Sequence, residues 1–575
     1  RITMMKNKKS ILLLTVTALI ILIGLSIGNP DGVQYLSLFA ALVFTIISSI
    51  FIYKNRAYAS FKPLEWLLLI VFSFIVQFSL LDNLHMTSST IFSLVLYAIS
   101  RTLLAMLLTA AVLSAIKQIN DFHYKFAHPK RYLGIATILI LAVSLYYWFA
   151  FFPAAMTPDS LAQWRQAHNG EFNDWHPIMI TWLIMLLTKI WDNPGIVAFT
   201  QIVVVVSIYA YTFDFFIKRK AHPVMIGLLT AIIVIIPSFL IFSIIIWKDI
   251  LYSAFLLFFT VNIAKIYLSE GAWIKSKAGF FLLLLSAFGV AFFRHNGFPV
   301  FVLTFLLMIV LFRKNWKPLV TIFLVVFILQ KIVTGPVFTW LDVQPSDPNE
   351  ALSIPTQQIA NIISNDGEMS REEREYFNKV LPIELWKEKY NPYKSDPIKF
   401  TWKYYDREFI FNDLGLYFKN YASIVIKNPY LATEGFLKQT ALVWQINPFK
   451  DGYTDTYVTN IYYGNDLGLK NKVIEPFITH TANAYLAIFK HPVFTFLWKP
   501  AFYHCVILLF SLMLVIRRGI TSLIIVIPWA LNTLSVLAAL PAQDFRYLLA
   551  SVFVSFFFIG LPFVRFDQKE RDVTS

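Results

Sequence analysis

The sequence has a single cysteine and few charged residues. Because Cys505 has no second cysteine to pair with, the sequence excludes an internal disulfide framework and a metal site built from several thiolates. Asp, Glu, Lys and Arg make up 14% of the 575 residues, whereas soluble domains contain about 25%. Hydrophobic residues make up 57%. This composition excludes an ordinary soluble enzyme and indicates a membrane protein.

The formal net charge of +15 could suggest a nucleic-acid partner. In multi-span proteins, however, Lys and Arg gather in cytoplasmic loops and orient the chain. We therefore expect no nucleic acid and take the lipid bilayer as the partner of the apolar surface. The apolar run 11–27 follows several lysines and is similar to a signal peptide. Many further spans follow and no convincing cleavage site is present, so we predict a retained first span.

Apolar runs of about the length that crosses a bilayer recur along the chain. They lie near 10–28, 33–53, 63–81, 90–116, 132–152, 195–217, 223–246, 250–268, 278–293, 298–312, 318–334, 500–516, 519–541 and 547–565. The basic loops then all fall on one side, which predicts an all-α polytopic membrane protein of about fourteen transmembrane helices with both termini cytoplasmic. The shorter run 178–191 is interpreted as a helix lying along the outer surface. A span there would move the later basic loops to the outer side and so invert their charge bias.

The runs divide the chain into four parts. Residues 1–131 form a four-span N-terminal extension, and residues 132–334 form the transmembrane core with a first outer loop at 153–194. Residues 335–499 are rich in Asn, Asp, Tyr, Lys and Pro and are expected to form one extracytoplasmic, mostly helical domain, with a helix-capping pattern at Ser370 and Glu373. Residues 500–575 hold three spans and a cytoplasmic tail.

Four dense polar clusters fall on the predicted outer side, each at the end of a span. They occupy residues 159–176, 247–249, 294–297 and 543–547. At a span end, charged groups avoid the cost of the hydrocarbon centre, about 2.5–3.5 kcal/mol each. We expect the four clusters to meet at one outward-facing site. The alternative for each cluster is structural, with basic side chains reaching the headgroups and with Lys248 pairing with Asp249, or Arg546 with Asp544.

Two other polar features were considered. A divalent metal could be held by Asp159, His168, Asp174 and His176 if the loop folds around it, and no other cofactor is expected. Arg101 lies in the middle of the fourth predicted span, so it must face a partner or a cavity.

Short motifs in these clusters occur in a recognisable order. Asp159 follows the outer end of a span, Gly170 comes next, and Trp-His-Pro stands at 175–177 ahead of an apolar helix. Arg-Tyr at 546–547 opens the last span. This order resembles the polyprenyl-phosphate-sugar-dependent glycosyltransferases of the GT-C fold, such as protein O-mannosyltransferases and lipid A aminoarabinose transferases.

The resemblance covers about residues 132–330 and 500–565 and departs from the family pattern in three places. Ser160 stands where the family has a second acid, Ile178 replaces a second proline, and four extra spans precede the core. These departures indicate a separate branch of the class, and the short loops and the Ile-, Lys- and Phe-rich composition suggest a bacterial source. They leave the sugar and the acceptor unassigned.

The resemblance implies an inverting transfer from a polyprenyl-phosphate sugar, and in a bacterium the acceptor would be a cell-wall polymer, surface glycan or protein. Such a transfer needs one base for the acceptor's proton and cations for the leaving phosphate. The matching acid of the class acts on the acceptor hydroxyl, which implies Asp159 as the catalytic base. The candidates for binding the donor phosphate are Arg294, Arg546 and Lys248. The candidates for positioning substrate are His176, Asp249, His295, Asn296, Asp544, Tyr547, Trp175 and Gln163.

Two other classes of function fit a polytopic chain. A transporter or flippase for lipid-linked glycans should carry ionisable residues near mid-membrane, of which Arg101 is the clearest here. A non-catalytic cell-envelope scaffold needs no cluster of charges at all. No nucleotide-binding glycine motif occurs on the predicted inner side, which favours a lipid-linked donor. The sequence therefore predicts a multi-pass glycosyltransferase of the cytoplasmic membrane with its site on the extracytoplasmic face.

Overall fold

The computed structural model describes residues 61–80, 91–118, 125–446 and 456–566, with a few positions before residue 49. Within these residues the chain is helical, and extended segments form isolated bridges only. The all-α class is therefore confirmed for the described part of the chain. The predicted spans near 10–28 and 33–53 and the tail beyond 566 lie almost entirely outside the described residues.

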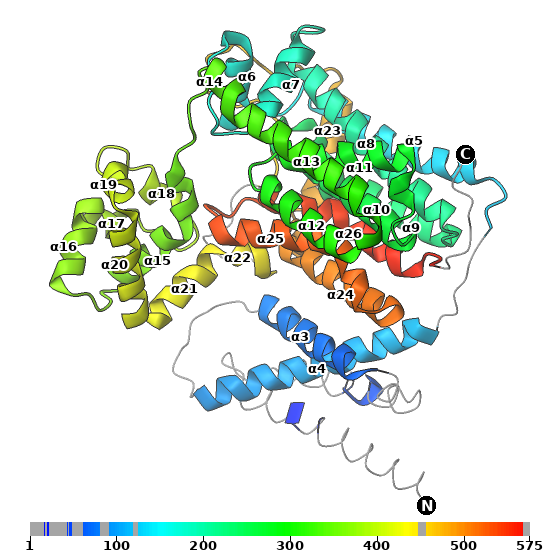
Figure 1. Cartoon of the computed structure of the whole chain (residues 1–575), viewed down its shortest axis with the longest axis horizontal. Coiled ribbons are helices and arrows are strands. Elements are labelled where there is room, and N and C mark those ends of the chain that lie inside the picture. Colours follow the sequence, from blue (N-terminus) through cyan, green and yellow to red (C-terminus); the bar gives the residue numbers. More distant parts are fainter. Residues whose placement is uncertain are drawn as a thin grey trace, which may run out of the picture.

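Each predicted span from residue 63 onward corresponds to a described helix (Figure 1). These helices are α3 (Pro63–Ser79), α4 (Ile91–Gln118), α5 (Pro129–Ala150), α8 (Pro194–Lys218), α9 (Pro223–Ile235), α10 (Lys248–Leu268), α11 (Lys277–Phe292), α12 (Gly297–Leu311), α13 (Trp316–Ile332), α24 (Pro500–Arg518), α25 (Ile527–Ala539) and α26 (Leu549–Gly560). By length and composition, 6 segments can cross a membrane, namely Pro129–Ala150, Pro194–Lys218, Lys248–Leu268, Arg313–Trp340, Pro500–Arg518 and Phe545–Phe563. The remaining apolar helical segments have 10–17 residues, with Ala98–Ser114 as the segment within α4. The chain is thus a multi-pass membrane protein by this measure, and the total of fourteen spans stays a prediction.

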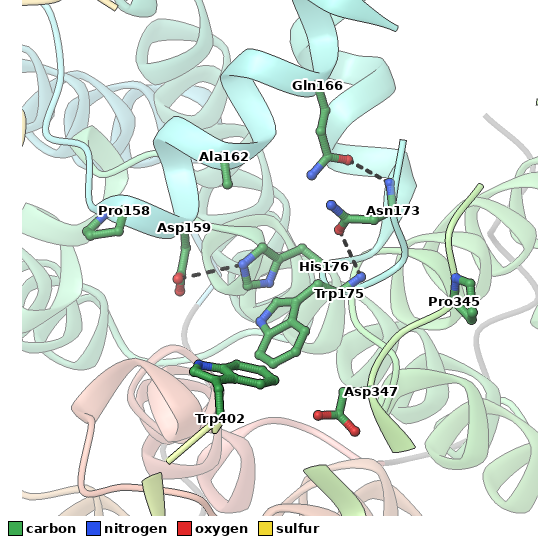
Figure 2. Close-up of a pocket in the computed structure, with 10 residues that line it drawn as sticks. All are labelled: Pro158, Asp159, Ala162, Gln166, Asn173, Trp175, His176, Pro345, Asp347 and Trp402. Carbon is green, nitrogen blue, oxygen red and sulfur yellow. Dashed lines mark hydrogen bonds and ion pairs between the residues drawn. The ribbon is translucent and has the colours of Figure 1, made fainter. Parts of the chain in front are cut away.

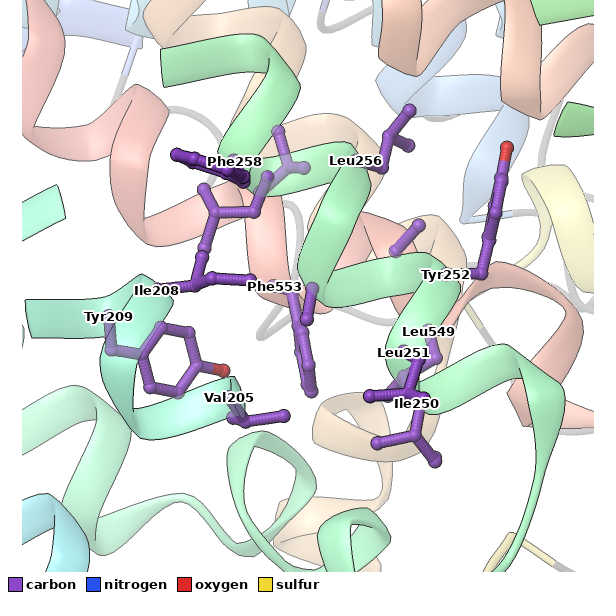
Figure 3. Packing of buried hydrophobic residues seen from close by; sticks show 14 of the residues in the cluster. Val205, Ile208, Tyr209, Ile250, Leu251, Tyr252, Leu256, Phe258, Leu549 and Phe553 are labelled. Atoms are coloured by element: carbon purple, nitrogen blue, oxygen red, sulfur yellow. The ribbon is translucent and has the colours of Figure 1, made fainter. Parts of the chain in front are cut away.

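Helix α10 is the centre of the bundle and packs against α8, α11 and α26. Figure 3 shows Val205 and Tyr209 of α8 and Phe553 of α26 gathered beside Ile250 and Leu251 of α10. The rings of Tyr209 and Phe553 have their centres 5.5 Å apart. Lipid tails are as apolar as leucine, so this contact is favoured by close packing rather than by escape from water.

The predicted span 223–246 is broken in the structure. Pro237 holds Ile236 in an extended conformation (ψ 111°), and α9 ends before it. Residues 237–247 then form two short 3₁₀ turns and an extended end, all of them buried. The side-chain amide of Gln201 donates to two carbonyls of this segment at 2.8 and 3.1 Å. Non-helical backbone is tolerated at membrane depth where protein surrounds and satisfies it. The segment delivers Lys248 and Asp249 to the first turn of α10.

The stretch predicted as one domain, 335–499, contributes to three hydrophobic clusters, the smallest of which joins Leu442 and Val443 to residues of α25 and beyond. Helices α15 to α21 enclose a core of their own around Phe377 and Trp386. These helices are α15 (Ser353–Ser364), α16 (Arg371–Val380), α17 (Ile383–Lys389), α18 (Asp396–Lys399), α19 (Arg407–Asn412), α20 (Leu414–Lys427) and α21 (Pro429–Gln439). We call residues 348–439 the helical domain; it lies beside the bundle (Figure 1). In contrast, Ala482 of α23 (Pro476–Ile488) and Trp498 belong to the core of the bundle.

Two local predictions can be checked directly. The capping box of α16 is confirmed, because the backbone amide of Glu373 donates to Ser370 Oγ at 3.2 Å and the Ser370 amide donates to Glu373 Oε2 at 2.6 Å. Arg101 of α4 was expected to face a partner or a cavity. Its Nε donates to Gln77 Oε1 of α3 at 2.8 Å. Helices α3 and α4 pack on each other, and α3 packs on α24.

Candidate functional site

The site begins at an extended segment after α5 that lies between two other segments of the chain. The Ala155 amide donates to the carbonyl of Ile244 at 3.0 Å, and the Ala155 carbonyl accepts from Ile246 at 3.0 Å. On the next residue, the Met156 amide donates to the carbonyl of Asn460 at 3.2 Å. Backbone pairing on both sides therefore fixes the position at which the next helix starts.

That helix, α6 (Pro158–Asn169), carries Asp159 in its first turn. The Thr157 amide donates to Ser160 Oγ at 3.1 Å, and this hydroxyl donates to the carbonyl of Ile246 at 2.7 Å. A carboxylate in the first turn of a helix is stabilised by the unpaired amides and by the helix dipole. The helix ends at Gly170, whose φ of +77° favours glycine.

Arg546 joins Asp159 to Asp544. Arg546 Nη1 is 2.8 Å from Asp159 Oδ2, and Arg546 Nε is 2.9 Å from Asp544 Oδ2. The guanidinium carbon also lies 4.7 Å from the ring centre of Trp247. Burial opposes ionisation of Asp159, but the neighbouring His176 and Arg546 outweigh it and hold the pKa of Asp159 well below its usual range. Asp159 is therefore ionised and, in this arrangement, only a weak proton acceptor.

His176 stands between Asp159 and Lys248. Its Nδ1 is 2.7 Å from Lys248 Nζ, and its Nε2 is 3.7 Å from Asp159 Oδ1. Because a lysine ammonium has donors only, Nδ1 accepts and the ring proton is assigned to Nε2, facing Asp159. Burial and the charge of Lys248 lower the pKa of His176, so the imidazole is neutral at pH 7.

Asp249 and Arg294 form a second, deeper pair. The Asp249 side chain is 1% exposed, and its Oδ1 is 3.3 Å from Arg294 Nη1. That nitrogen also donates to the carbonyl of Tyr547 at 2.8 Å. Neither carboxylate oxygen of Asp249 accepts a hydrogen bond from the described residues. A buried carboxylate without hydrogen bonds is costly, so this position suits a bound polar group.

His295 and Asn296 follow Arg294 in a tight connection to α12. His295 Nε2 lies 3.0 Å from the carbonyl of Asp174, and burial raises the pKa of the Asp174 carboxyl to about 6. Asn296 Nδ2 donates to Ser535 Oγ of α25 at 2.8 Å. A Cβ on Gly297 would come within 1.9 Å of a backbone oxygen of α11, so the close approach of the two helices requires glycine there.

The structure thus brings the four polar clusters together, and the roles assigned to their residues stay predictions. Gln163 is buried within α6 and does not line the cavity described below, whereas Trp175 does. The residues considered for a metal do not converge: His168 Nε2 contacts Asp192 Oδ1 at 2.8 Å, away from Asp159. Within the described residues, no group of three or more His, Cys, Asp or Glu side chains is placed to hold a metal.

A cavity of about 580 Å³ opens beside Asp159 (Figure 2). It is lined by Pro158, Asp159, Ala162, Gln166, Asn173, Trp175, His176, Pro345, Asp347 and Trp402. Sequence reasoning missed Gln166, Asn173, Asp347 and Trp402. No spacing in the sequence relates Trp402 of the helical domain to Asp159, because only the folded chain brings them together.

Residues 168–575 match a family of unknown function, DUF6020. The match covers more than half of the chain. The chain belongs to the DUF6020 family. The DUF6020 match includes Lys248, Arg294 and Arg546 but begins after Asp159. No curated protein and no solved structure matches the chain.

Proposed function

We propose that this DUF6020 protein is a membrane glycosyltransferase that moves a sugar from a polyprenyl-phosphate donor to an acceptor hydroxyl. The observation that carries the proposal is the contact between Asp159 and Arg546 at 2.8 Å, at the edge of a cavity and beside Lys248 and Arg294. A carboxylate next to several cations is what an inverting transfer from a phosphate leaving group requires. The resemblance of the sequence to GT-C glycosyltransferases supports the same reaction.

In the proposed reaction the acceptor oxygen forms a bond to the anomeric carbon of the donor sugar. The bond between that carbon and the phosphate oxygen breaks, and the polyprenyl phosphate leaves with the electron pair. The acceptor's proton passes to Asp159. Arg294, Arg546 and Lys248 stabilise the charge that develops on the phosphate; the planar guanidinium groups can each bind two oxygens.

The position of Arg546 links proton transfer to donor binding. In the absence of donor, its guanidinium keeps Asp159 ionised and weakly basic. A donor phosphate competes with Asp159 for the same guanidinium, so donor binding weakens that ion pair and raises the pKa of Asp159 toward its ordinary value. Asp159 accordingly becomes a competent base when the sugar to be transferred is in place.

The proposed location follows from the distribution of basic loops. These loops orient the chain with its termini in the cytoplasm, which puts the proposed site at the extracytoplasmic face of the cytoplasmic membrane. The donor's polyprenyl chain stays in the bilayer, and its sugar phosphate reaches the ends of α10, α11 and α26. The acceptor is a cell-envelope glycan, polymer or protein.

The test is transfer of radiolabelled sugar by the purified full chain in lipid nanodiscs. Synthetic polyprenyl-phosphate sugars are the donors and extracted cell envelope is the acceptor. Asp159→Asn should abolish transfer, whereas Asp466→Asn, a change to a 77% exposed aspartate that pairs with Arg165, should leave it intact. Equal transfer by the Asp159→Asn variant would refute the role of Asp159. Movement of lipid-linked sugar between vesicle leaflets without any transfer would replace the transferase with a flippase.

A further inference from the structure

One wall of the cavity beside Asp159 is formed by residues that have no role in the proposed transfer reaction. Trp402 and Asp347 form this wall together with Trp175, which lies in the loop before α7 (Ile178–Thr188). Figure 2 shows the rings of Trp175 and Trp402 bordering the same space below Asp159 and His176. The loop before α7 and the helical domain therefore line the cavity together with α6.

The exposed tryptophan of this wall is held in place. The Arg407 guanidinium carbon lies 4.1 Å from the ring centre of Trp402, and Arg407 Nε donates to Asp347 Oδ2 at 2.7 Å. Phe400 stacks on Trp402 with ring centres 5.5 Å apart, and Trp175 lies 6.3 Å from Phe400. Trp402 nevertheless remains 61% exposed. An apolar ring that is fixed in position but left open to a cavity is arranged for a ligand.

The other groups around the cavity indicate the chemistry of that ligand. Asp159, Asp347, Gln166 and Asn173 offer carboxylate and amide groups near the aromatic rings. None of the described residues that line the cavity is Lys or Arg. The two carboxylates are each paired with an arginine outside the lining, Asp159 with Arg546 and Asp347 with Arg407, so the lining itself offers a phosphate-bearing ligand carboxylates and no cation. A neutral sugar, by contrast, has C–H faces that pack on flat aromatic rings and hydroxyl edges that bond to carboxylates and amides.

We propose that this cavity binds sugar rings of the acceptor, so that the acceptor is a neutral glycan rather than a phosphate-containing polymer or a polypeptide. This inference rests on the proposed transferase function. The donor sugar is assigned to the other side of Asp159, because the three candidate phosphate ligands belong to span ends and do not line the cavity. An acceptor hydroxyl held in the cavity lies next to Asp159, gives its proton to that carboxylate, and attacks the anomeric carbon as the phosphate leaves.

The test compares ligand binding by the full-length protein and three tryptophan variants in nanodiscs. The probes are fluorescently labelled chito-, malto- and manno-oligosaccharides, a poly(glycerol phosphate) and a Ser/Thr-rich peptide. Trp402→Ala should weaken oligosaccharide binding about 30-fold, the effect expected when a central tryptophan is truncated. Trp402→Phe should recover much of the affinity. Trp340→Ala, which removes a tryptophan that is 81% exposed and outside the cavity, should have no effect.

The possible outcomes separate the inference from the function on which it rests. Polyprenyl-phosphate binding is measured in parallel and should be unchanged in all three variants, because the candidate phosphate ligands do not line the cavity that Trp402 borders. If polyprenyl phosphate fails to bind the parent protein, the transferase is refuted. If it binds, the glycan inference is overturned by equal oligosaccharide binding in the parent and Trp402→Ala, by binding of none of the oligosaccharides, or by preference for the poly(glycerol phosphate) or the peptide.

Discussion

Replacing Asp159 with asparagine should strengthen binding of the donor phosphate while it abolishes transfer. The site carries three cationic side chains, Lys248, Arg294 and Arg546, and three acids, Asp159, Asp249 and Asp544. The asparagine has nearly the same shape as the aspartate, but it removes one negative charge. It leaves an excess of positive charge where the phosphate is expected, and it frees Arg546 from one of its two carboxylate partners.

The size of the effect on binding follows from the geometry. A phosphate on Arg546 would lie on the order of 5 Å from the Asp159 carboxylate, and two unit charges at that distance repel by about 3 kcal/mol at an effective dielectric constant near 20. The Asp159 side chain is 34% exposed, so solvent reduces this repulsion. A discounted value of about 1 kcal/mol corresponds to roughly fivefold tighter binding. Transfer should fall by about 10²–10⁴, the usual contribution of a general base.

Two measurements on the same preparation check this prediction. Polyprenyl-phosphate affinity is measured at low and high salt, because the gain should shrink as salt screens the exposed part of the charge. Sugar transfer is measured in parallel, and thermal unfolding confirms that the variant is folded. Transfer at the parent rate would show that Asp159 is not the base. A weaker or unchanged affinity would show that the phosphate does not bind next to it.

Three further changes test the surroundings of the site. Burial raises the pKa of Asp174 from 3.8 to about 6, so the folded state binds this proton more tightly and the protein loses stability as pH rises between these values. Asp174→Asn should remove about 2 kcal/mol of that loss, measured by thermal unfolding across this pH range. The same dependence of stability on pH in parent and variant would contradict the assignment. Lys399 is fully buried, and its Nζ lies 3.0 Å from Glu350 Oε2 and 3.3 Å from Asp396 Oδ1. Lys399→Met should destabilise the helical domain by about 3–5 kcal/mol, because it leaves buried carboxylates without a cation. Adding Glu350→Gln should restore part of the stability, as measured by limited proteolysis. Gln543 is buried and forms hydrogen bonds of 2.6–3.0 Å with three backbone groups, two of them in the helical domain. Gln543→Leu should lower the free energy of unfolding by about 1–3 kcal/mol and speed hydrogen exchange in residues 439–446. Unchanged exchange would show that other contacts hold the helical domain against the bundle.

Hydropathy predicted the positions of the described apolar helices because polar residues flank each apolar run. It did not predict the break in 223–246, because an average over a window does not register that Pro237 restricts the residue before it. The sequence also did not predict that residues 335–499 are divided among three hydrophobic clusters. Helix α23 packs on α5 of the bundle, and that contact depends on the tertiary fold.

The residues that form the polar site were predictable from the sequence, but the contacts between them were predictable only in part. Polar side chains at span ends stand out against apolar helices, and this signal identified all four segments. The pairing of Lys248 with Asp249 was considered from the sequence, yet Lys248 contacts His176 and Asp249 contacts Arg294. Adjacent residues on a helix point in different directions, so the two side chains at the start of α10 reach different partners. The contact of Arg546 with Asp544 was foreseen; its second contact with Asp159 was not.

The arrangement around Arg546 explains why segments so distant in sequence should act together. Donor and acceptor of an inverting transfer must approach the anomeric carbon from opposite sides, and the base must stand on the acceptor's side. Trp402 and Trp175 line the cavity beside Asp159, whereas the cations at the span ends do not line it. Arg546 contacts Asp159 and lies three residues after Gln543, which donates hydrogen bonds to two carbonyls of the helical domain. In the proposed mechanism, a shift of that domain on glycan binding would reach Arg546 through only a few residues and would alter the ion pair of Arg546 with Asp159.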